Sequence, residues 1–346
     1  MLNSQEENKF KVQLISTLTT LVYNNIYCSN PKDDIKASDA ANALEKRLLG
    51  FRAELDIKQV LQKDKDRQLL DGGFMLPTKT DSLPHQNSVY FTVSSDAPDK
   101  YIPVYENLSK LDFLQMFFVT YSLSLETWSL SDELIKGESL LVPNTECLSF
   151  IDGSFTKLQF TTQRELMRSF TRRRDIYKAE YSIESKKQEI NKAQELLKQY
   201  SITELQSLVA ERYIYDGIIG GKVYKGMPAD IDLITFRFDR YNFIEVKEKD
   251  LSKREPIGFG MDVHRLSNML TMEKVTQIPY FYIVKHVNNQ RERIYQGWKY
   301  VRLKGFEKAV EGYGTINGGM GMSTKSSEHP TLVAPKEKFI DFPSKY

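Results

Sequence analysis

Acidic and basic residues alternate with apolar ones in the segment DIDLITFRFDRYNFIEVK. Two apolar runs in this segment predict the strands of a β-hairpin, and side chains alternate between the two faces of a strand. A two-residue turn at 238–239 places Asp232 opposite Glu245 in the antiparallel register. The same register places Asp230 opposite Lys247. Opposed carboxylates, with Cβ atoms about 5 Å apart, repel each other across a sheet. A divalent cation between them would remove the repulsion, so the pattern predicts a metal site.

The spacing of these residues resembles the motif of the PD-(D/E)xK nuclease superfamily. Asp232, Glu245 and Lys247 carry the match as D-x(12)-E-x-K, in the strings PADIDLI and FIEVK. Both strings are similar to segments of small bacterial nucleases related to Holliday-junction resolvases. The proline of the first string precedes Ala229 rather than the catalytic aspartate, so Asp230 is the alternative to Asp232 as the first ligand. The motif is short, and an ordinary hairpin with a solvated charged face is the competing interpretation.

The resemblance implies a metal-dependent site that hydrolyses phosphodiester bonds. Asp232 and Glu245 would bind Mg²⁺, with Mn²⁺ as a substitute, because a few hard oxygen ligands suit magnesium better than zinc. Further candidate metal ligands are Asp230, Glu211 and the backbone carbonyl oxygen of Val246. Lys247 would orient or deprotonate the attacking water and stabilise negative charge on the phosphate.

The order of elements around the motif agrees with this resemblance. The segment SITE at 201–204 predicts a capping box that opens a helix. Glu211 lies later on that helix, before the first expected strand, and a plain surface glutamate is its alternative role. The strand RYIYDGIIGGKVYKG, the two motif strands, a helix over 259–275 and the strand PYFYIVKHV follow. The order α-β-β-β-α-β is that of a restriction-endonuclease-like core with a mixed central sheet, an α/β (α+β) fold.

The N-terminal half contains no motif with chemistry of its own. Apolar residues at helical spacing predict a helix over 5–24, and one or two more over 38–70, which Asp71-Gly72-Gly73 would stop. The other elements expected there are a strand at 88–93, helices at 109–125 and 130–135, and extended chain at 140–160. A long charged helix is expected from 162 to 198. We expect three parts: a largely helical recognition or assembly domain (1–160), a charged helical connector (161–200) and the nuclease domain (201–346).

Positive charge gathers in the expected connector. Residues 160–200 contain ten Lys or Arg against six Asp or Glu, whereas the whole chain has a net charge of only +2. Such clusters suit contacts with phosphates. The candidate nucleic-acid-binding residues are Arg172, Arg173, Arg174 and, beside the motif, Lys249. A solvated helix with i, i+4 ion pairs is the alternative interpretation of this stretch.

Length and composition limit the other possibilities. A chain of 346 residues is expected to form two domains. Cys28 and Cys147 are the two cysteines, without a CxxC motif, which disfavours a disulfide framework or a zinc–thiolate site. The first residues lack the apolar stretch of a signal peptide, and the most apolar window, 111–125, is too short to span a bilayer. The sequence thus predicts a cytoplasmic protein without a membrane partner.

The expected core is much shorter than the chain, so the residues before it are expected to recognise a target or mediate assembly. The interpretation that we favour is a sequence-specific, Mg²⁺-dependent DNA endonuclease of a restriction system, which acts as a homodimer to cut both strands. A repair, recombination or phage nuclease that recognises DNA structure is the alternative enzyme. A nucleic-acid-binding protein without catalysis is the alternative outside enzymes, and RNA stays open as a substrate.

Overall fold

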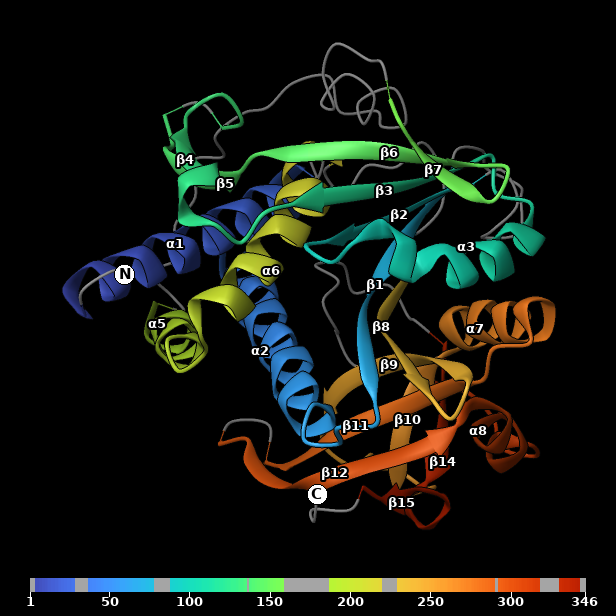
Figure 1. Cartoon of the computed structure of the whole chain (residues 1–346). Helices are drawn as coiled ribbons and strands as arrows, with labels where there is room; N and C mark the ends of the chain where they lie inside the picture. The colour runs from blue at the N-terminus through green and yellow to red at the C-terminus, as the bar shows by residue number, and fades with distance from the viewer. Residues whose placement is uncertain are drawn as a thin grey trace. The chain divides into compact units, whose positions relative to one another are not determined.

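The computed structural model (Figure 1) describes residues 4–28, 37–77, 88–135, 137–158, 187–219, 229–289, 292–317 and 330–342. The protein is α+β, with strands in mixed sheets and several helices. Its chain divides into two compact units, and both are discontinuous in sequence. Unit 1 comprises 1–52, 74–106 and 112–228, and unit 2 comprises 53–73, 107–111 and 229–346.

Unit 2 is built around a mixed sheet whose strands lie in the order β15-β12-β11-β9-β8-β1. Their bounds are Gln68–Pro77 for β1 (to residue 73 in this unit), Ala229–Arg237 for β8, Arg240–Lys249 for β9, Tyr280–Asn288 for β11, Ile294–Arg302 for β12 and Ile340–Asp341 for β15. β8 and β9 pair antiparallel, β9 and β11 parallel, and β11 and β12 antiparallel. A smaller sheet joins β10 (Gly258–Asp262), β14 (Pro330–Pro335) and β13 (Ile316–Asn317).

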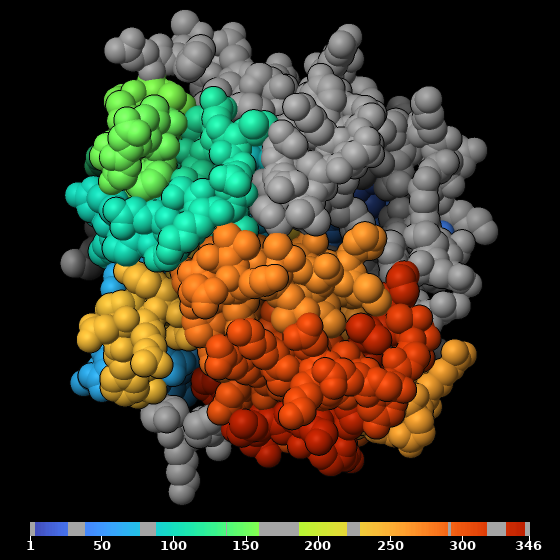
Figure 2. All heavy atoms as spheres, turned by 90° about the vertical axis from the view of Figure 1, so that its right-hand side faces the viewer, coloured from blue at the N-terminus to red at the C-terminus, as the bar shows by residue number. Residues whose placement is uncertain are grey.

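Helices cover both faces of the main sheet of unit 2. On one face the end of α2 (Ala37–Leu61) joins a buried core, whose members are Ala53, Ile57, Leu61, Leu233, Ile244, Val246, Ile283 and Trp298. α7 (Val263–Thr276) lies on the opposite face, since its Arg265 reaches Glu245, whose side chain alternates with those of Ile244 and Val246. α8 (Leu303–Val310) packs beside α7, and Figure 2 shows the two as neighbouring orange and red surfaces. Unit 2 therefore has three layers, helix on sheet on helix.

The β8–β9 hairpin has the register that the sequence predicts. Leu233 pairs with Ile244. The next pair in this register sets Asp232 opposite Glu245. The two turn residues at 238–239 have positive φ angles of 50° and 55°, as tight turns between antiparallel strands require. The predicted turn and register are confirmed, and so is the strand expected in PYFYIVKHV, which forms β11.

The strand beside β8 comes from an unexpected part of the chain. The sequence predicts helix over 38–70, but α2 ends at Leu61 and residues 68–77 form β1. A Cβ on Gly72 would lie 1.7 Å from the backbone oxygen of Ile231 in β8, so glycine is required for the close approach of the two backbones. The glycines therefore mark a contact between strands and not the end of a helix.

The strand expected in RYIYDGIIGGKVYKG is not formed by its described residues. α6 (Ile202–Arg212) begins with the predicted capping box at Ser201 and Glu204, and η5 (Tyr213–Ile219) continues it as a π-helix. Both pack against α1 (Ser4–Cys28). This helix confirms the one predicted over residues 5–24. The remaining residues of the string, 220–226, lie outside the described part of the chain. The apolar residues of this stretch thus face other helices, which a short apolar run alone does not reveal.

Unit 1 also combines helices and strands. The prediction that residues 1–160 form a largely helical domain is wrong, because β1 to β7 lie in this stretch. Its strands lie in the order β1-β2-β3-β6-β7, with β1 and β2 antiparallel and β2 and β3 parallel. Their bounds are Ser88–Ser94 for β2, Gln115–Tyr121 for β3, Thr145–Ile151 for β6 and Ser154–Lys157 for β7. β4 (Trp128–Ser131) and β5 (Leu140–Pro143) form a separate pair, and η1 (Pro98–Tyr101) and α3 (Ile102–Leu108) connect β2 to β3.

Two helices predicted in unit 1 are strands or irregular chain instead. The window 109–125 forms a short turn of helix followed by β3, in which Met116 to Val119 are all buried. The window 130–135 contains the end of β4. A run buried on both faces of a sheet shows no alternation, so its pattern is the same as that of a buried helix. The strand at 88–93 and the extended chain at 140–157 are confirmed.

The two units do not follow the predicted boundaries at 160 and 200. Most of unit 1 is inserted in the sequence between β1 and β8, which are neighbours in the sheet of unit 2. Of the predicted charged helix over 162–198, the described residues include α5 (Lys187–Leu197), which belongs to unit 1. Helices in the described segments are all too short or too polar to cross a membrane.

Candidate metal centre

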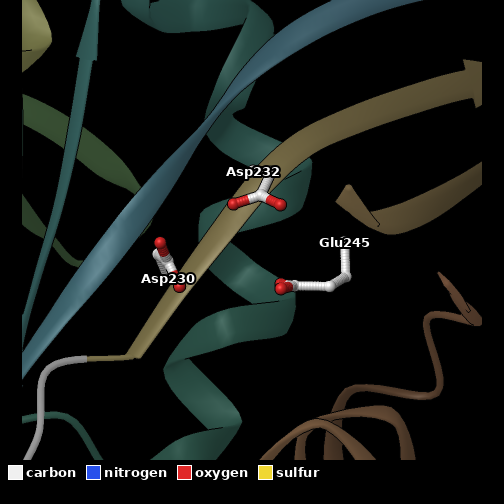
Figure 3. Close-up of side chains that lie close together, drawn as sticks. All are labelled: Asp230, Asp232 and Glu245. Atoms are coloured by element: carbon white, nitrogen blue, oxygen red, sulfur yellow. The ribbon is translucent and has the colours of Figure 1, made fainter. Parts of the chain in front are cut away.

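Three carboxylates lie together at the end of the β8–β9 hairpin that is remote from its turn. Asp230 and Asp232 come from β8 and Glu245 from β9, and one oxygen of each lies within 4.8 Å of the others. Figure 3 shows the side chain of Glu245 extending toward the strand that bears the aspartates. Among the described residues, this is the one group of three possible metal-ligating side chains so close together. The hairpin brings together the acids that the sequence predicts.

The three carboxylates differ in their exposure to solvent. The side chain of Glu245 is 0 % exposed and that of Asp232 is 4 % exposed, whereas that of Asp230 is 38 % exposed. A buried carboxylate is costly unless other groups compensate its charge. Glu245 and Asp232 therefore need partners, and Asp230 forms the solvent side of the cluster.

Two cations partly compensate these acids. Lys247 shares a face of β9 with Glu245, and its Nζ lies 2.6 Å from Oε1 of Glu245 and 3.6 Å from Oδ2 of Asp232. Arg265, in the first turn of α7, places Nη2 3.1 Å from Oδ1 of Asp230 and pairs through Nη1 with Oε1 of Glu245. With all five groups ionised, three negative charges face two positive ones.

One oxygen at the centre of the cluster has no partner. Oε2 of Glu245 is buried without a hydrogen bond. By contrast, Oδ2 of Asp232 accepts a hydrogen bond of 2.6 Å from the backbone N–H of Val246. Leaving a buried acceptor without a partner costs about 1–3 kcal/mol. A cation bound by this oxygen and by Asp230 and Asp232 would remove that cost and the surplus negative charge, so the residues present fit a metal ion with oxygen ligands.

The proton affinities of the site reflect the same crowding. Burial raises the pKa of Asp232 well above its usual range, and the charge of Glu245 raises it further, although Lys247 lowers it. Burial lowers the pKa of Lys247, but the charges of Asp232 and Glu245 outweigh this effect and the pKa is raised. Lys247 therefore stays protonated, as a group that donates a hydrogen bond to an anion must.

The other predicted site residues occupy different places. Val246 contributes its N–H to Asp232, and the role predicted for its carbonyl oxygen stays a prediction. Glu211 lies in α6 of unit 1, where it pairs with Arg212, and it does not belong to the acidic cluster. The prediction assumed that the helix directly before β8 in the sequence packs on the sheet that contains the hairpin. In the structure, α2 packs on that sheet instead. Residues 172–174 lie outside the described part of the chain.

Lys249 continues the row of Glu245 and Lys247 along one face of β9. Burial lowers the pKa of Lys249. The charge of Asp262 raises it, but the charges of Lys247 and Arg265 lower it, and the net result is a lowered pKa. A third cation thus follows the site along the strand. This position agrees with its predicted contact with a phosphate backbone, which stays a prediction.

Two charged residues near the acids are not among the site residues that the sequence predicts. Arg265 has a signal in the sequence, because it shares one stripe of α7 with the buried Met269 and Met272 at i+4 and i+7. A charged residue on an apolar stripe needs a partner. Glu54 on α2 has no such signal, and its charge contributes to the raised pKa of Asp232. Its proximity to Asp232 follows only from the structure, in which α2 packs on the sheet that contains the hairpin.

Fold and site together define an α+β protein with a partly compensated acidic cluster on the hairpin of a mixed sheet. Comparison of the chain with family models, with curated proteins and with solved structures gives no match. Any functional assignment therefore rests on the geometry of the site.

Proposed function

We propose that this protein is a metal-dependent endonuclease of the PD-(D/E)xK type that hydrolyses phosphodiester bonds in DNA. The observation that carries the proposal is the buried Oε2 of Glu245, which has no hydrogen-bond partner while two further carboxylates lie beside it. A lysine on the same face of the hairpin completes the set that the motif implies. An ordinary solvated hairpin would not bury at its centre a carboxylate with one oxygen that has no hydrogen bond.

The arrangement of unit 2 supports the resemblance to the superfamily. Within unit 2, α2, β1, β8, β9, α7 and β11 occur in this order along the chain, with β10 between β9 and α7. Without β10, this is the order α-β-β-β-α-β that the resemblance implies. The first helix and strand come from residues 53–73 instead of the segment directly before the hairpin. Helices cover both faces of a sheet in which β9 and β11 run parallel. The core order is thus present with a different source for its first two elements.

In the proposed mechanism, Asp230, Asp232 and Glu245 would hold a divalent cation. All three supply hard oxygen ligands, which suits Mg²⁺, with Mn²⁺ as a substitute. The bound ion would supply an activated water and offset the charge of the scissile phosphate. Lys247 donates a hydrogen bond to a phosphate oxygen and stabilises the negative charge that develops there. Its raised pKa favours this role over that of a base.

The proposed substrate is duplex DNA, cut at a specific sequence by a homodimer in which each chain supplies one site. Unit 1 is the proposed region for target recognition or assembly. Discrete fragments from plasmid DNA would support this type of specificity. Cutting of branched or single-stranded DNA alone would support a repair or recombination nuclease instead, and RNA is tested as a parallel substrate.

Plasmid cleavage with Mg²⁺ or Mn²⁺ tests the catalytic proposal. We expect Asp232→Asn and Glu245→Gln to lose both cleavage and Mn²⁺ binding, measured by calorimetry, because each removes a charged ligand. Lys247→Met should lower the cleavage rate by roughly a hundredfold to a thousandfold, the usual effect of removing one donor to a developing anion, and should keep the metal. Full cleavage by any of these variants would contradict the assignment.

Glu248→Gln provides the matched control for Glu245→Gln. Glu248 lies on the same strand and is 3 % exposed, but it alternates to the other face, where Lys285 lies 3.4 Å away. Loss of a buried ion pair as such would impair both glutamine variants alike. We expect the control to cleave plasmid at the rate of the wild type, with the folded fraction of each variant checked by thermal melting.

A further inference from the structure

Arg265 reaches the acidic cluster from α7, the helix that follows the hairpin in sequence. Its Nη2 lies 3.1 Å from Oδ1 of Asp230, and its Nη1 pairs with Oε1 of Glu245. The guanidinium thus bridges two of the three candidate metal ligands, one from each strand. The planar fork of an arginine suits such bridging and stays charged throughout the physiological pH range.

The two cations of the site occupy different edges of the cluster. Lys247 joins the two buried acids, Glu245 and Asp232. Arg265 joins the buried Glu245 to Asp230, which is 38 % exposed. A hydrated ion that enters from solvent therefore meets the edge that the guanidinium spans. An ion bound by Asp230 and Glu245 must compete with Arg265 for both of them.

The side chain of Arg265 can turn away from the acidic cluster, whereas the side chain of its acceptor Glu245 cannot. Arg265 is 28 % exposed and long enough to turn toward solvent, but Glu245 is 0 % exposed and fixed in the sheet. A guanidinium released from carboxylates is suited to bind a phosphate in the same bidentate manner. When an ion and a phosphate bind, Arg265 would thus lose its carboxylate partners, Asp230 and Glu245, and gain the phosphate as its partner.

We propose that Arg265 is a displaceable counter-ion: it neutralises Asp230 and Glu245 when no metal is bound, gives them up to a divalent cation, and then binds the scissile phosphate. The displacement by metal rests on the contacts of the side chain alone. The second step, binding of the phosphate, also rests on the proposed nuclease function. Competition between the guanidinium and the ion is reciprocal, because each weakens the binding of the other.

Calorimetric titration of the full chain with Mn²⁺ tests the displacement. Arg265→Met removes the competitor, so we expect it to bind Mn²⁺ about tenfold more tightly than the wild type. A residue that merely organises the acids would give the opposite result, since its loss would loosen them and weaken binding. Unchanged or weaker Mn²⁺ binding by Arg265→Met would overturn the proposal.

Arg293→Met is the matched control. Arg293 is 24 % exposed and pairs with the buried Glu248 of the same strand, on the face away from the cluster. Its loss should leave the affinity for Mn²⁺ unchanged. Because Arg265→Met leaves three acids with a single cation, we also titrate Arg265→Lys, which retains the charge without the bridging fork. It should bind Mn²⁺ more tightly than the wild type by a smaller factor, about threefold, and weaker binding by this variant would equally overturn the proposal.

Cleavage and binding data separate this inference from the proposed function. Tighter Mn²⁺ binding by Arg265→Met without plasmid cleavage by the wild type would support the displacement and end the nuclease proposal. Cleavage by the wild type with unchanged metal affinity in Arg265→Met would support the nuclease and end the displacement. If both hold, Arg265→Met should bind DNA more weakly than the wild type in Ca²⁺, measured by fluorescence anisotropy, because the phosphate has lost its partner.

Discussion

Each unit buries acidic side chains among cations, but the two units balance the charges differently. In unit 1, Asp216 of η5 is 0 % exposed and accepts a hydrogen bond from Asn25. Arg47 lies 3.5 Å and Arg212 3.7 Å from its oxygens. Arg212 also pairs with Glu211, so two acids face two arginines.

Among the described residues, three acids of the unit 2 cluster pair with two cations. Asp230, Asp232 and Glu245 share Lys247 and Arg265. Oε2 of Glu245 has no hydrogen bond; Oδ2 of Asp216 also lacks one, but Arg212 lies 3.7 Å from it. A balanced buried group needs nothing further and can serve as part of the scaffold. When all three of its acids are ionised, the cluster of unit 2 has a surplus of negative charge, which favours the binding of a positive ion.

The same connection of elements occurs in both units. An antiparallel hairpin, a helix and a strand parallel to the second hairpin strand are formed by β1, β2, α3 and β3 in unit 1 and by β8, β9, α7 and β11 in unit 2. On the face toward the helix, β2 carries Tyr90, Thr92 and Ser94, and β9 carries Glu245, Lys247 and Lys249. Tyr90 stacks edge-on with Tyr105 of α3, and Ser94 accepts a hydrogen bond from Tyr101. Equivalent positions thus form a hydroxyl-bearing core in one unit and an ionic site in the other.

The largest effect on stability is expected from Asp216→Ala in unit 1. The change leaves Arg47 and Arg212 partly buried without their shared acid, and breaking a buried charge pair costs about 3–5 kcal/mol. Urea unfolding should show this loss, with the same value in EDTA and in Mg²⁺. A loss under about 1 kcal/mol would mean that this acid is not structural, and the contrast between the units would fail.

Asp232→Asn in unit 2 should have a smaller effect of the opposite sign. The asparagine oxygen can still accept from the N–H of Val246, and the change removes repulsion with Glu245. We expect the metal-free protein to gain about 1 kcal/mol of unfolding free energy, the scale of a cross-strand charge pair. The rise in melting temperature that Mn²⁺ gives the wild type should disappear. Destabilisation as large as that of Asp216→Ala would contradict a functional role for the charge.

The smallest effect is expected in the pH dependence of the difference in unfolding free energy between Asp232→Asn and the wild type. Because the pKa of Asp232 is raised on folding, its protonated form is favoured in the folded state. Its contribution to stability is fully present below the unfolded-state pKa, about 3.9, and is lost as pH rises through the raised folded-state pKa. In EDTA, the advantage of Asp232→Asn over the wild type should therefore grow with pH and then level off. Urea unfolding of both proteins between about pH 4 and 9 measures this, and an advantage that shrinks with pH would reverse the assigned sign.

Local patterns in the sequence predict much of the candidate site. The hairpin register and its turn depend on alternation over a short segment, and the motif depends on the spacing of three residues. The capping box depends on Ser201 and Glu204, three residues apart. The sequence predicts the helix that ends at Leu61, but not its packing on this sheet or the strand that begins at Gln68, because their partners lie more than 150 residues later in the chain. Strand β3 was mistaken for a helix because burial on both faces removes the alternation that identifies a strand.

The interrupted sequence of unit 2 has a consequence for synthesis of the protein. β1 leaves the ribosome long before β8, and the residues between them form most of unit 1. During translation, one edge of β1 has no paired strand until β8 has been synthesised. A fragment that begins at residue 201 would lack the cover of Leu233, Ile244 and Val246 by α2 and should aggregate through its open strand edge. The acidic cluster can therefore form only after β8, β9 and α7, residues 229–276 of a chain of 346, have been synthesised.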